Sequence, residues 1–216
     1  MGFSAPINPG RRSSSVDRLY WEKQTRKSGF SPVSGLDEAG RGPLAGPVVA
    51  AAVILPPGEE FSPLVIDSKK LSPRRREEAY VYLCNLSGLE SGVGVVGLGE
   101  IDRINILQAT IAAMKAALQK LPSPPFFLLV DGLTITGTEI RQQKLIRGED
   151  QSISIAAASI IAKVTRDRMM VAYDREYPCY GFARHKGYGT REHIQALKKY
   201  GPCPLHRRSF RPLRKA

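Results

Sequence analysis

Residues 33–55, VSGLDEAGRGPLAGPVVAAAVIL, contain two apolar runs separated by a loop rich in glycine and proline. The runs Val33 to Asp37 and Val48 to Leu55 have the small and β-branched composition that is typical of buried strands. Because glycine and proline interrupt the chain between them, we expect the two strands to pair as a hairpin. The first strand ends on two adjacent carboxylates, Asp37 and Glu38, beside a loop whose glycines permit close approach to a ligand.

The rest of the chain predicts an α/β fold with a mixed sheet, because several strands are followed by alternating helices. Residues 1–14 are rich in Gly, Pro, Ser and Arg and are expected to be a disordered extension, which leaves one domain over residues 15–216. Further strands are expected at Gly92 to Gly99, Phe126 to Val130 and Lys144 to Ile146. The expected helices are a short one capped by Ser14 or Ser15 and ending near Gly29, then Ser72-capped Pro73 to Leu86, Ile101 to Leu121, Ser152 to about Tyr177, and Thr190 to Gly201.

The chain is strongly basic, with a formal net charge of +12 over 216 residues, which favours a polyanionic partner such as nucleic acid. The segment Arg184 to Ala216 holds ten basic residues against one acid, Glu192. A solvated basic tail is one interpretation of that segment. A structured binding face is favoured by its interleaved rings, Tyr188, His193, Tyr200, His206 and Phe210.

Membrane insertion and secretion are not expected. The sequence has no run of 18 or more apolar residues, and its N-terminus lacks the apolar core of a signal peptide. Its three cysteines, Cys84, Cys179 and Cys203, are odd in number and widely spaced, so they predict neither a disulfide framework nor a zinc site. We therefore expect a cytoplasmic protein whose thiols are buried or merely tolerated.

Carboxylates follow three of the predicted strands. They are Asp37 with Glu38, Asp131, and Glu149 with Asp150. Strand ends at one edge of an α/β sheet converge, and carboxylates gathered there repel one another unless cations neutralise them. Oxygen ligands of this kind suit Mg²⁺ or Mn²⁺. In a basic protein this cluster indicates metal-assisted cleavage of phosphodiesters.

Each of these positions also has an ordinary structural interpretation. Asp131 with Gly132 is typical of a turn, and Glu149 with Asp150 could place negative charge before a helix N-terminus. Asp37 and Glu38 could form a surface ion pair with Arg41. Only the joint occurrence of the carboxylates favours a cation site. The spacing of the loop glycines does not fit a dinucleotide-binding motif, and the prolines interrupt the helix which that motif needs.

Five segments of the chain together match a known family in order and spacing. The chain resembles bacterial ribonuclease HII. The matching segments are Gly35 to Val49, Asp67 to Ser72, Leu129 to Gly132, Ser154 to Asp167, and His185 to Thr190.

The resemblance implies a ribonuclease H-like fold, in which helices flank a mixed five-stranded sheet and a basic helical segment follows at the C-terminus. It implies hydrolysis of RNA in RNA/DNA hybrids with two Mn²⁺ or Mg²⁺ ions. It also implies incision 5′ to single ribonucleotides embedded in duplex DNA, leaving a 3′-hydroxyl and a 5′-phosphate. A monomer is expected. The alternatives are a hybrid nuclease without single-ribonucleotide activity and a catalytically inactive nucleic-acid-binding module.

The resemblance also implies roles for individual residues. Asp37, Glu38 and Asp131 are similar to the metal ligands of the family. Gly40, Arg41 and Gly42 resemble the loop that recognises the ribose 2′-hydroxyl. The remaining expected substrate-binding residues are Lys69, Asn105 and Lys163 on the backbone near the scissile phosphate, Tyr188 packed on the neighbouring deoxyribose, and His185 of the same segment.

One position departs from the family pattern. The family usually has Gly-Asp six residues before the isoleucine of its Ile-Ala-Ala-Ala-Ser motif, and here Glu149 occupies that place with Asp150 as its neighbour. Either the longer Glu149 side chain serves as the fourth carboxylate or Asp150 replaces it through a shift of the backbone. Glu149 is favoured because an ungapped match fixes its register.

Overall fold

The structure is a computed structural model that describes residues 17–58 and 60–213. The predicted extension over residues 1–14 and the serines expected to cap the first helix lie outside these residues. That helix begins at Tyr20, with Leu19 at its N-cap position and no side-chain cap hydrogen bond. The elements are α1 Tyr20–Lys27, β1 Val33–Ala39, β2 Val48–Ile54, α2 Pro73–Asn85, β3 Glu90–Val96, α3 Leu98–Gln119, β4 Phe127–Asp131, β5 Arg141–Leu145, α4 Ile153–Glu176, α5 Phe182–His185 and α6 Arg191–Tyr200, with 3₁₀ turns at Ser68–Lys70 and Gly148–Asp150.

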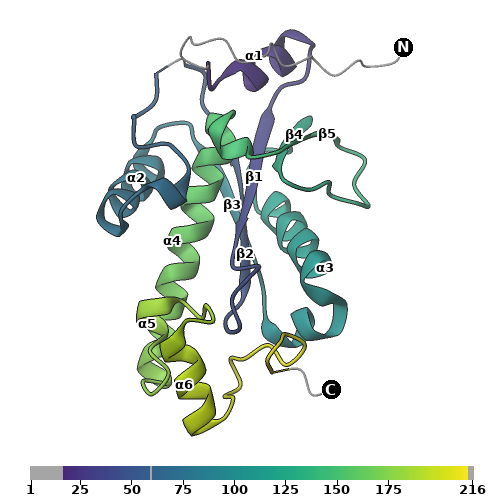
Figure 1. The fold of residues 1–216 in the computed structure, drawn as a ribbon. Coiled ribbons are helices and arrows are strands. Elements are labelled where there is room, and N and C mark those ends of the chain that lie inside the picture. Colours follow the sequence, from purple (N-terminus) through teal and green to yellow (C-terminus); the bar gives the residue numbers. More distant parts are fainter. Residues whose placement is uncertain (1–16, 59, 214–216) are drawn as a thin grey trace.

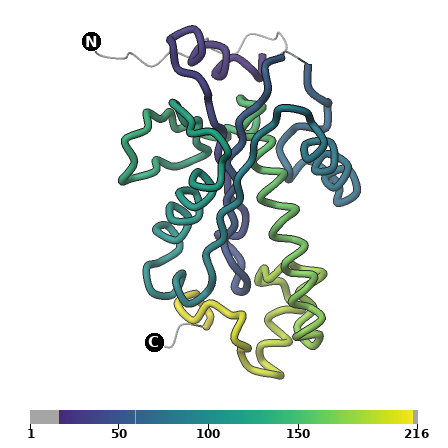
Figure 2. The backbone as a smooth tube through the Cα atoms, turned by 180° about the vertical axis from the view of Figure 1, so that it is seen from behind, coloured from purple at the N-terminus to yellow at the C-terminus, as the bar shows by residue number. Residues whose placement is uncertain are grey.

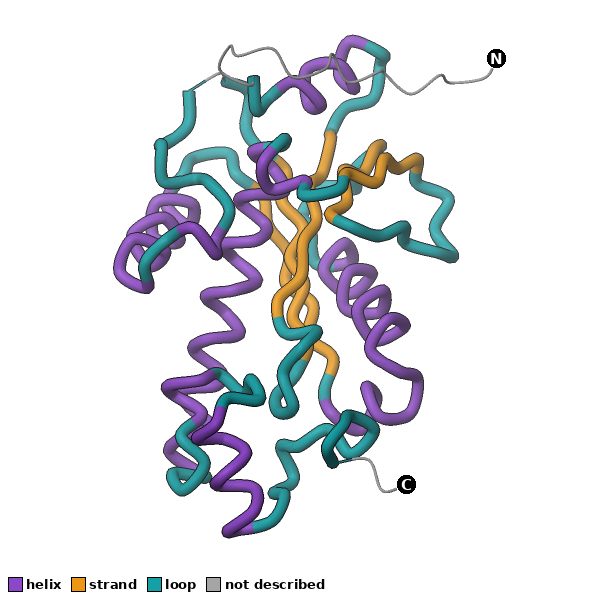
Figure 3. The backbone as a smooth tube through the Cα atoms, viewed as in Figure 1, coloured by secondary structure: helices purple, strands orange, loops and turns teal. Residues whose placement is uncertain are grey.

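The five strands form one mixed sheet in the order β3-β2-β1-β4-β5. The first three strands pair antiparallel, whereas β4 and β5 run parallel to β1. The expected hairpin of β1 and β2 is confirmed, with Asp37 opposite Ala51. Figure 3 shows this strand layer between helices. The predicted mixed five-stranded α/β architecture is therefore correct.

Helices cover both faces of the sheet, with α4 on one and α3 on the other (Figure 1; Figure 2 from behind). The side chains of β2 alternate between two cores. Val49, Ala51 and Val53 join the core under α4, and the intervening residues from Val48 to Ile54 join the core under α3. Burial on both faces explains why β2 is apolar throughout rather than alternating with polar residues.

Glycines allow these helices to approach the sheet closely. A Cβ on Gly35 of β1 would lie 2.3 Å from the Ser154 carbonyl carbon of α4, and one on Gly94 of β3 would lie 1.9 Å from the Ala113 oxygen of α3. Neither backbone atom can move aside without displacing its helix. These two positions therefore set the distance between the sheet and both of its helical layers.

We expect Gly94→Ala to lower the free energy of unfolding by about 2–3 kcal/mol, in the range measured for overpacked cores. Gly99→Ala is the matched control, since a Cβ there meets nothing within 4 Å. Urea unfolding followed by circular dichroism measures both variants. Equal stability of the two variants would show that α3 does not depend on this close contact.

Three local features differ from the sequence-based expectations. Strand β5 lies at 141–145, earlier in the chain than predicted. The prediction missed its start because β5 is a polar edge strand without an apolar pattern. Helix α3 begins earlier, at Leu98, and is kinked at Asn105 (φ 69°). The Oδ1 atom of Asn105 accepts hydrogen bonds from the N–H groups of Leu107 and Gln108, so this residue caps the second part of α3. The short helix α5 was not expected at all.

The basic segment after α4 folds onto the end of that helix that projects beyond the sheet (Figure 1). Its helix α6 confirms the predicted C-terminal helix, with Thr190 as the cap. The predicted binding face is wrong for two of its rings, because His193 and His206 are buried, whereas Tyr188 and Tyr200 are exposed. Cys84 and Cys179 are also exposed, and all three cysteines are free. No helix among the described residues could span a membrane.

Candidate active site

The sheet brings the predicted carboxylates together. Strands β1 and β4 are parallel neighbours with Leu36 opposite Val130, so Asp37 and Asp131 follow side by side. The N–H of Gly148 donates a 2.6 Å hydrogen bond to Oδ1 of Asp131, which holds the 3₁₀ turn Gly148–Asp150 against the end of β4. Three segments far apart in the sequence thus meet at one edge of the sheet.

These carboxylates lie in one another's electric field. Burial raises the pKa of Asp37 well above its usual value, and the charges of Glu38 and Asp131 raise it further. Burial also raises the pKa of Glu38, although Arg41 partly offsets this. The pKa of Asp131 is raised to about 6, first by burial and then by the charge of Glu149. Bound cations would relieve this repulsion.

Glu149 and Asp150 point to different surroundings. Glu149 is 6% exposed, and its Oε1 lies 3.6 Å from Nζ of Lys69. Asp150 instead pairs with Lys70 and with Arg147, whose Nη2 lies 2.7 Å from its Oδ2. These hydrogen bonds and charges lower the pKa of Asp150. The structure therefore places Glu149 with the other carboxylates and turns Asp150 toward exposed bases.

The donor atoms at this site fit a cation that prefers oxygen. Glu38 Oε2 and Glu149 Oε2 are buried without a hydrogen-bond partner, and a buried carboxylate oxygen is costly unless it is paired or coordinates a metal. Within residues 17–58 and 60–213, no three His, Cys, Asp or Glu side chains are already arranged as a metal-binding group.

Two buried arginines hold the glycine loop between β1 and β2 by its carbonyl groups. Arg207, from the segment after α6, donates to the oxygens of Gly40 (2.6 Å), Arg41 (3.0 Å) and Gly46. Arg166 of α4 donates at 3.0 Å to the oxygens of Pro47 and Ala45. Neither guanidinium pairs with a carboxylate of the described chain, and burial lowers the pKa of Arg207 to about 9. Sequence reasoning missed both residues.

The glycine loop begins directly after the acidic pair and lies beside Tyr188. Nη1 of the exposed Arg41 is 3.4 Å from Oε1 of Glu38. Cε1 of Tyr188 is 3.7 Å from the point that a Cβ on Gly42 would occupy. The structure thus places Gly42 beside Tyr188, and Arg41 of the same loop beside Glu38.

A chain of hydrogen bonds through two buried histidines fixes the backbone of Tyr188. The N–H of Cys203 donates to Nδ1 of His206 (3.0 Å), so the ring proton of His206 is on Nε2. That proton is donated to Nε2 of His193 (3.0 Å), whose Nδ1–H then donates to the Tyr188 oxygen (2.9 Å). Burial lowers the pKa of His193 and brings that of His206 to about 4, so both rings are neutral at pH 7.

The other predicted substrate-binding residues fall into two groups. Lys69 lies with the carboxylates, whose charges outweigh the effect of burial and raise its pKa. His185, Lys163 and Asn105 make internal contacts instead. Both ring nitrogens of the buried His185 are used, by the Tyr180 oxygen and the Gly187 N–H. Lys163 donates to Asp167 at 2.7 Å, and Asn105 caps α3. Their contact with substrate stays a prediction.

Comparison with known proteins decides the family. The family model described as Ribonuclease HII matches residues 34–212. The chain belongs to the ribonuclease HII family. Ribonuclease HII of Geobacter sulfurreducens is 55% identical over 194 residues, which are 90% of this chain and 88% of that protein. Ribonuclease HII of Caldanaerobacter subterraneus is 51% identical over 191 residues, 88% of this chain and 78% of that protein.

Solved ribonuclease HII structures have the same fold. Ribonuclease H2 of Pyrococcus horikoshii matches with a TM-score of 0.68 and 28% identity over 84% of this chain and 95% of that one. Archaeoglobus fulgidus ribonuclease HII, solved with PCNA, matches with a TM-score of 0.70 and 25% identity over 85% and 97%. The chain is thus a type 2 ribonuclease H, an endonuclease of a family in which metal binding is typical.

Proposed function

We propose that this ribonuclease HII cleaves RNA in RNA/DNA hybrids and also incises duplex DNA on the 5′ side of a single embedded ribonucleotide, leaving a 3′-hydroxyl and a 5′-phosphate. The observation that supports this most is the contact between the glycine loop and the acidic pair. Arg41 of the loop lies 3.4 Å from Glu38, so a sugar held by the loop would have an adjoining phosphate close to the carboxylates. Recognition and chemistry would share one site.

Asp37, Glu38, Asp131 and Glu149 would hold two Mg²⁺ or Mn²⁺ ions. Such ions, when bound, stabilise the attacking and leaving oxygens of an in-line displacement. The chain itself supplies positive charge at the same place, because Lys69 lies beside Glu149 and Arg41 beside Glu38. These side chains would orient the phosphate and would lower the electrostatic cost of bringing a polyanion to an acidic cluster.

Discrimination between RNA and DNA would rest on the ribose 2′-hydroxyl. The loop 40–42 and the exposed ring of Tyr188 form a surface beside Glu38 on which one sugar can pack. The exposed basic residues of the C-terminal segment would bind phosphates without selecting a sequence. We also propose that the enzyme acts as a monomer in the cytoplasm, a reducing compartment that suits its free cysteines.

The direct test is a set of duplexes of one sequence: an RNA/DNA hybrid, a DNA duplex with one ribonucleotide, and an all-DNA duplex. Each is incubated with the wild type in Mg²⁺, in Mn²⁺ and in EDTA. We expect cleavage of the first two only, and only with metal. Cleavage of the hybrid alone would restrict the enzyme to hybrids, and binding without any cleavage would identify an inactive module.

A further inference from the structure

The segment that follows α6 crosses back to the glycine loop and is paired with it along the backbone. The N–H of Gly46 donates to the Leu205 oxygen at 2.9 Å, and the N–H of Arg207 donates to the Leu44 oxygen at 2.9 Å. The side chain of Arg207 then passes under the loop and is fully buried. We propose that Arg207 is a positioning residue that holds the loop 40–42 in the conformation that recognises the ribose 2′-hydroxyl. This inference rests on the proposed function.

The hydrogen bonds of Arg207 determine which way two peptide groups face. Its Nη2 binds the oxygen of Gly40 at 2.6 Å and its Nη1 binds that of Arg41 at 3.0 Å. Both peptide bonds are trans, so each carbonyl points opposite to the N–H of the next residue. With both carbonyls directed at Arg207, the N–H groups of Arg41 and Gly42 are directed away from it.

Those two N–H groups are free to bind a ligand. In the part of the chain that the structure describes, neither has a hydrogen-bond acceptor. They belong to exposed residues, and Gly42 lies beside the ring of Tyr188. Two neighbouring N–H donors beside the exposed ring of Tyr188 suit a hydroxyl oxygen, which accepts such bonds. Arg207 would thus orient the donors without touching the substrate.

An arginine is well suited to this position. Its planar guanidinium presents five donors in a fixed fork, so one side chain can bind three carbonyl oxygens at defined angles. A lysine ammonium carries fewer donors and no fork. The neighbouring Arg166 does not duplicate this role, since it donates to the oxygens of Ala45, Pro47 and Lys186 and not to those of Gly40 or Arg41. Among the described side chains, only that of Arg207 binds the carbonyl groups of Gly40 and Arg41.

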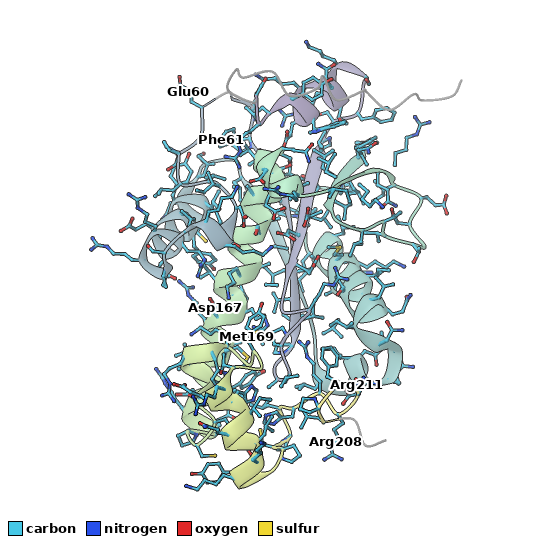
Figure 4. The ribbon with its side chains drawn as sticks, in the orientation of Figure 1. Glu60, Phe61, Asp167, Met169, Arg208 and Arg211 are labelled. Carbon is cyan, nitrogen blue, oxygen red and sulfur yellow. The ribbon has the colours of Figure 1, made fainter. Side chains whose placement is uncertain are left out.

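The test compares Arg207→Gln with Arg208→Gln. Both variants lose one positive charge from adjacent positions, but the side chain of Arg208 is exposed and points away from the molecule (Figure 4). Each is combined with Asp131→Asn so that substrate is bound and not cut. Fluorescence anisotropy in Mg²⁺ then gives the Kd for a duplex with one ribonucleotide and for the same duplex made of DNA alone. The ratio of the two Kd values measures recognition of the 2′-hydroxyl.

We expect the Asp131→Asn background to prefer the ribonucleotide duplex by about tenfold, in line with one or two added hydrogen bonds. Arg207→Gln should reduce that ratio to about twofold or less while the Kd for DNA changes little. Arg207→Lys should recover part of the ratio. Arg208→Gln should weaken both complexes by the same factor, because it removes only a charge near phosphates.

An unchanged ratio in folded Arg207→Gln, or equal effects of the two glutamine variants, overturns the inference. Thermal melting by circular dichroism establishes folding. If Arg207→Gln does not fold, the test uses Arg207→Lys. A ratio of Kd values for Arg207→Lys that equals the ratio of the Asp131→Asn background contradicts the role of the guanidinium fork. A background protein with no preference for the ribonucleotide, or one that still cuts it, contradicts the proposed function instead.

Discussion

Asp131→Asn is expected to abolish metal-dependent cleavage and to leave binding of an RNA/DNA hybrid nearly unchanged. The substitution removes a charge that would hold a cation, while Oδ1 can still accept the 2.6 Å hydrogen bond from Gly148. Loss of one group that stabilises charge in a transition state typically lowers kcat by about 10²–10³-fold, and a cation ligand should reach at least that range. Single-turnover cleavage and anisotropy measure the two effects separately.

Glu139→Gln is the matched control for this variant. Glu139 is an exposed residue between β4 and β5, and no described residue forms an ion pair with it. We expect this variant to retain wild-type cleavage. Full activity of Asp131→Asn would remove Asp131 from the site, and a parallel loss of binding would mean that the residue supports the fold rather than the chemistry.

Substitution of Glu149 and of its neighbour Asp150 is expected to have very different effects on cleavage. Glu149→Gln should lower kcat by roughly a hundredfold, because Glu149 is buried with an unpartnered oxygen beside Lys69. Asp150→Asn should stay within about twofold of the wild type, since it removes only exposed pairs with Lys70 and Arg147. Both changes replace a carboxylate with an amide of the same shape. Rates are measured in Mg²⁺ and in Mn²⁺.

The reverse order, with Asp150→Asn the more damaging change, would show that the backbone shifts when substrate binds and that Asp150 is the fourth carboxylate. If Glu149→Gln and Asp150→Asn are equally active, neither residue is singled out as the fourth carboxylate. The assigned metal ligands would then be Asp37, Glu38 and Asp131 alone. A defect of Glu149→Gln in Mg²⁺ alone would indicate that Glu149 determines metal preference more than it determines the reaction itself.

Much of the fold follows from apolar pattern and chain breaks. β2 is uninterrupted because both of its faces are covered, and Ser72, Ser152 and Thr190 are caps whose side chains accept hydrogen bonds from helix N–H groups. The apolar pattern does not predict an element whose position is set by tertiary contacts. The edge strand β5 is polar, and its place depends on pairing with β4 rather than on its own composition.

The sequence predicts the site to the extent that it predicts where strands end. Carboxylates at the carboxyl ends of neighbouring parallel strands lie close together, as Asp37 and Asp131 do. The sequence favoured Glu149 over Asp150 by register alone, because the direction in which each side chain leaves the 3₁₀ turn depends on contacts such as the hydrogen bond from Gly148 to Asp131. Arg166 and Arg207 were missed for another reason. A buried arginine that binds backbone carbonyls looks, in sequence, like any surface base. Arg207 has no carboxylate near it in the sequence, and Asp167, which follows Arg166 directly, pairs with Arg76 and Lys163 instead.

The close spacing of Glu38 and Arg41 has a functional consequence. If one loop holds the ribose and the adjacent carboxylates cut the phosphate, the position of the ribonucleotide fixes the position of the cut. The sequence of the duplex would have no influence. This coupling is the central claim of the proposed function.

The most direct test uses a series of otherwise identical DNA duplexes in which one ribonucleotide is moved by one position at a time. Products are mapped at nucleotide resolution after cleavage by the wild type in Mg²⁺ or Mn²⁺. We expect the cut to move in step with the ribonucleotide, always at the phosphate on its 5′ side, with a 3′-hydroxyl and a 5′-phosphate. A cut that stays at a fixed sequence or a fixed distance from the end, or one on the 3′ side, would contradict the account.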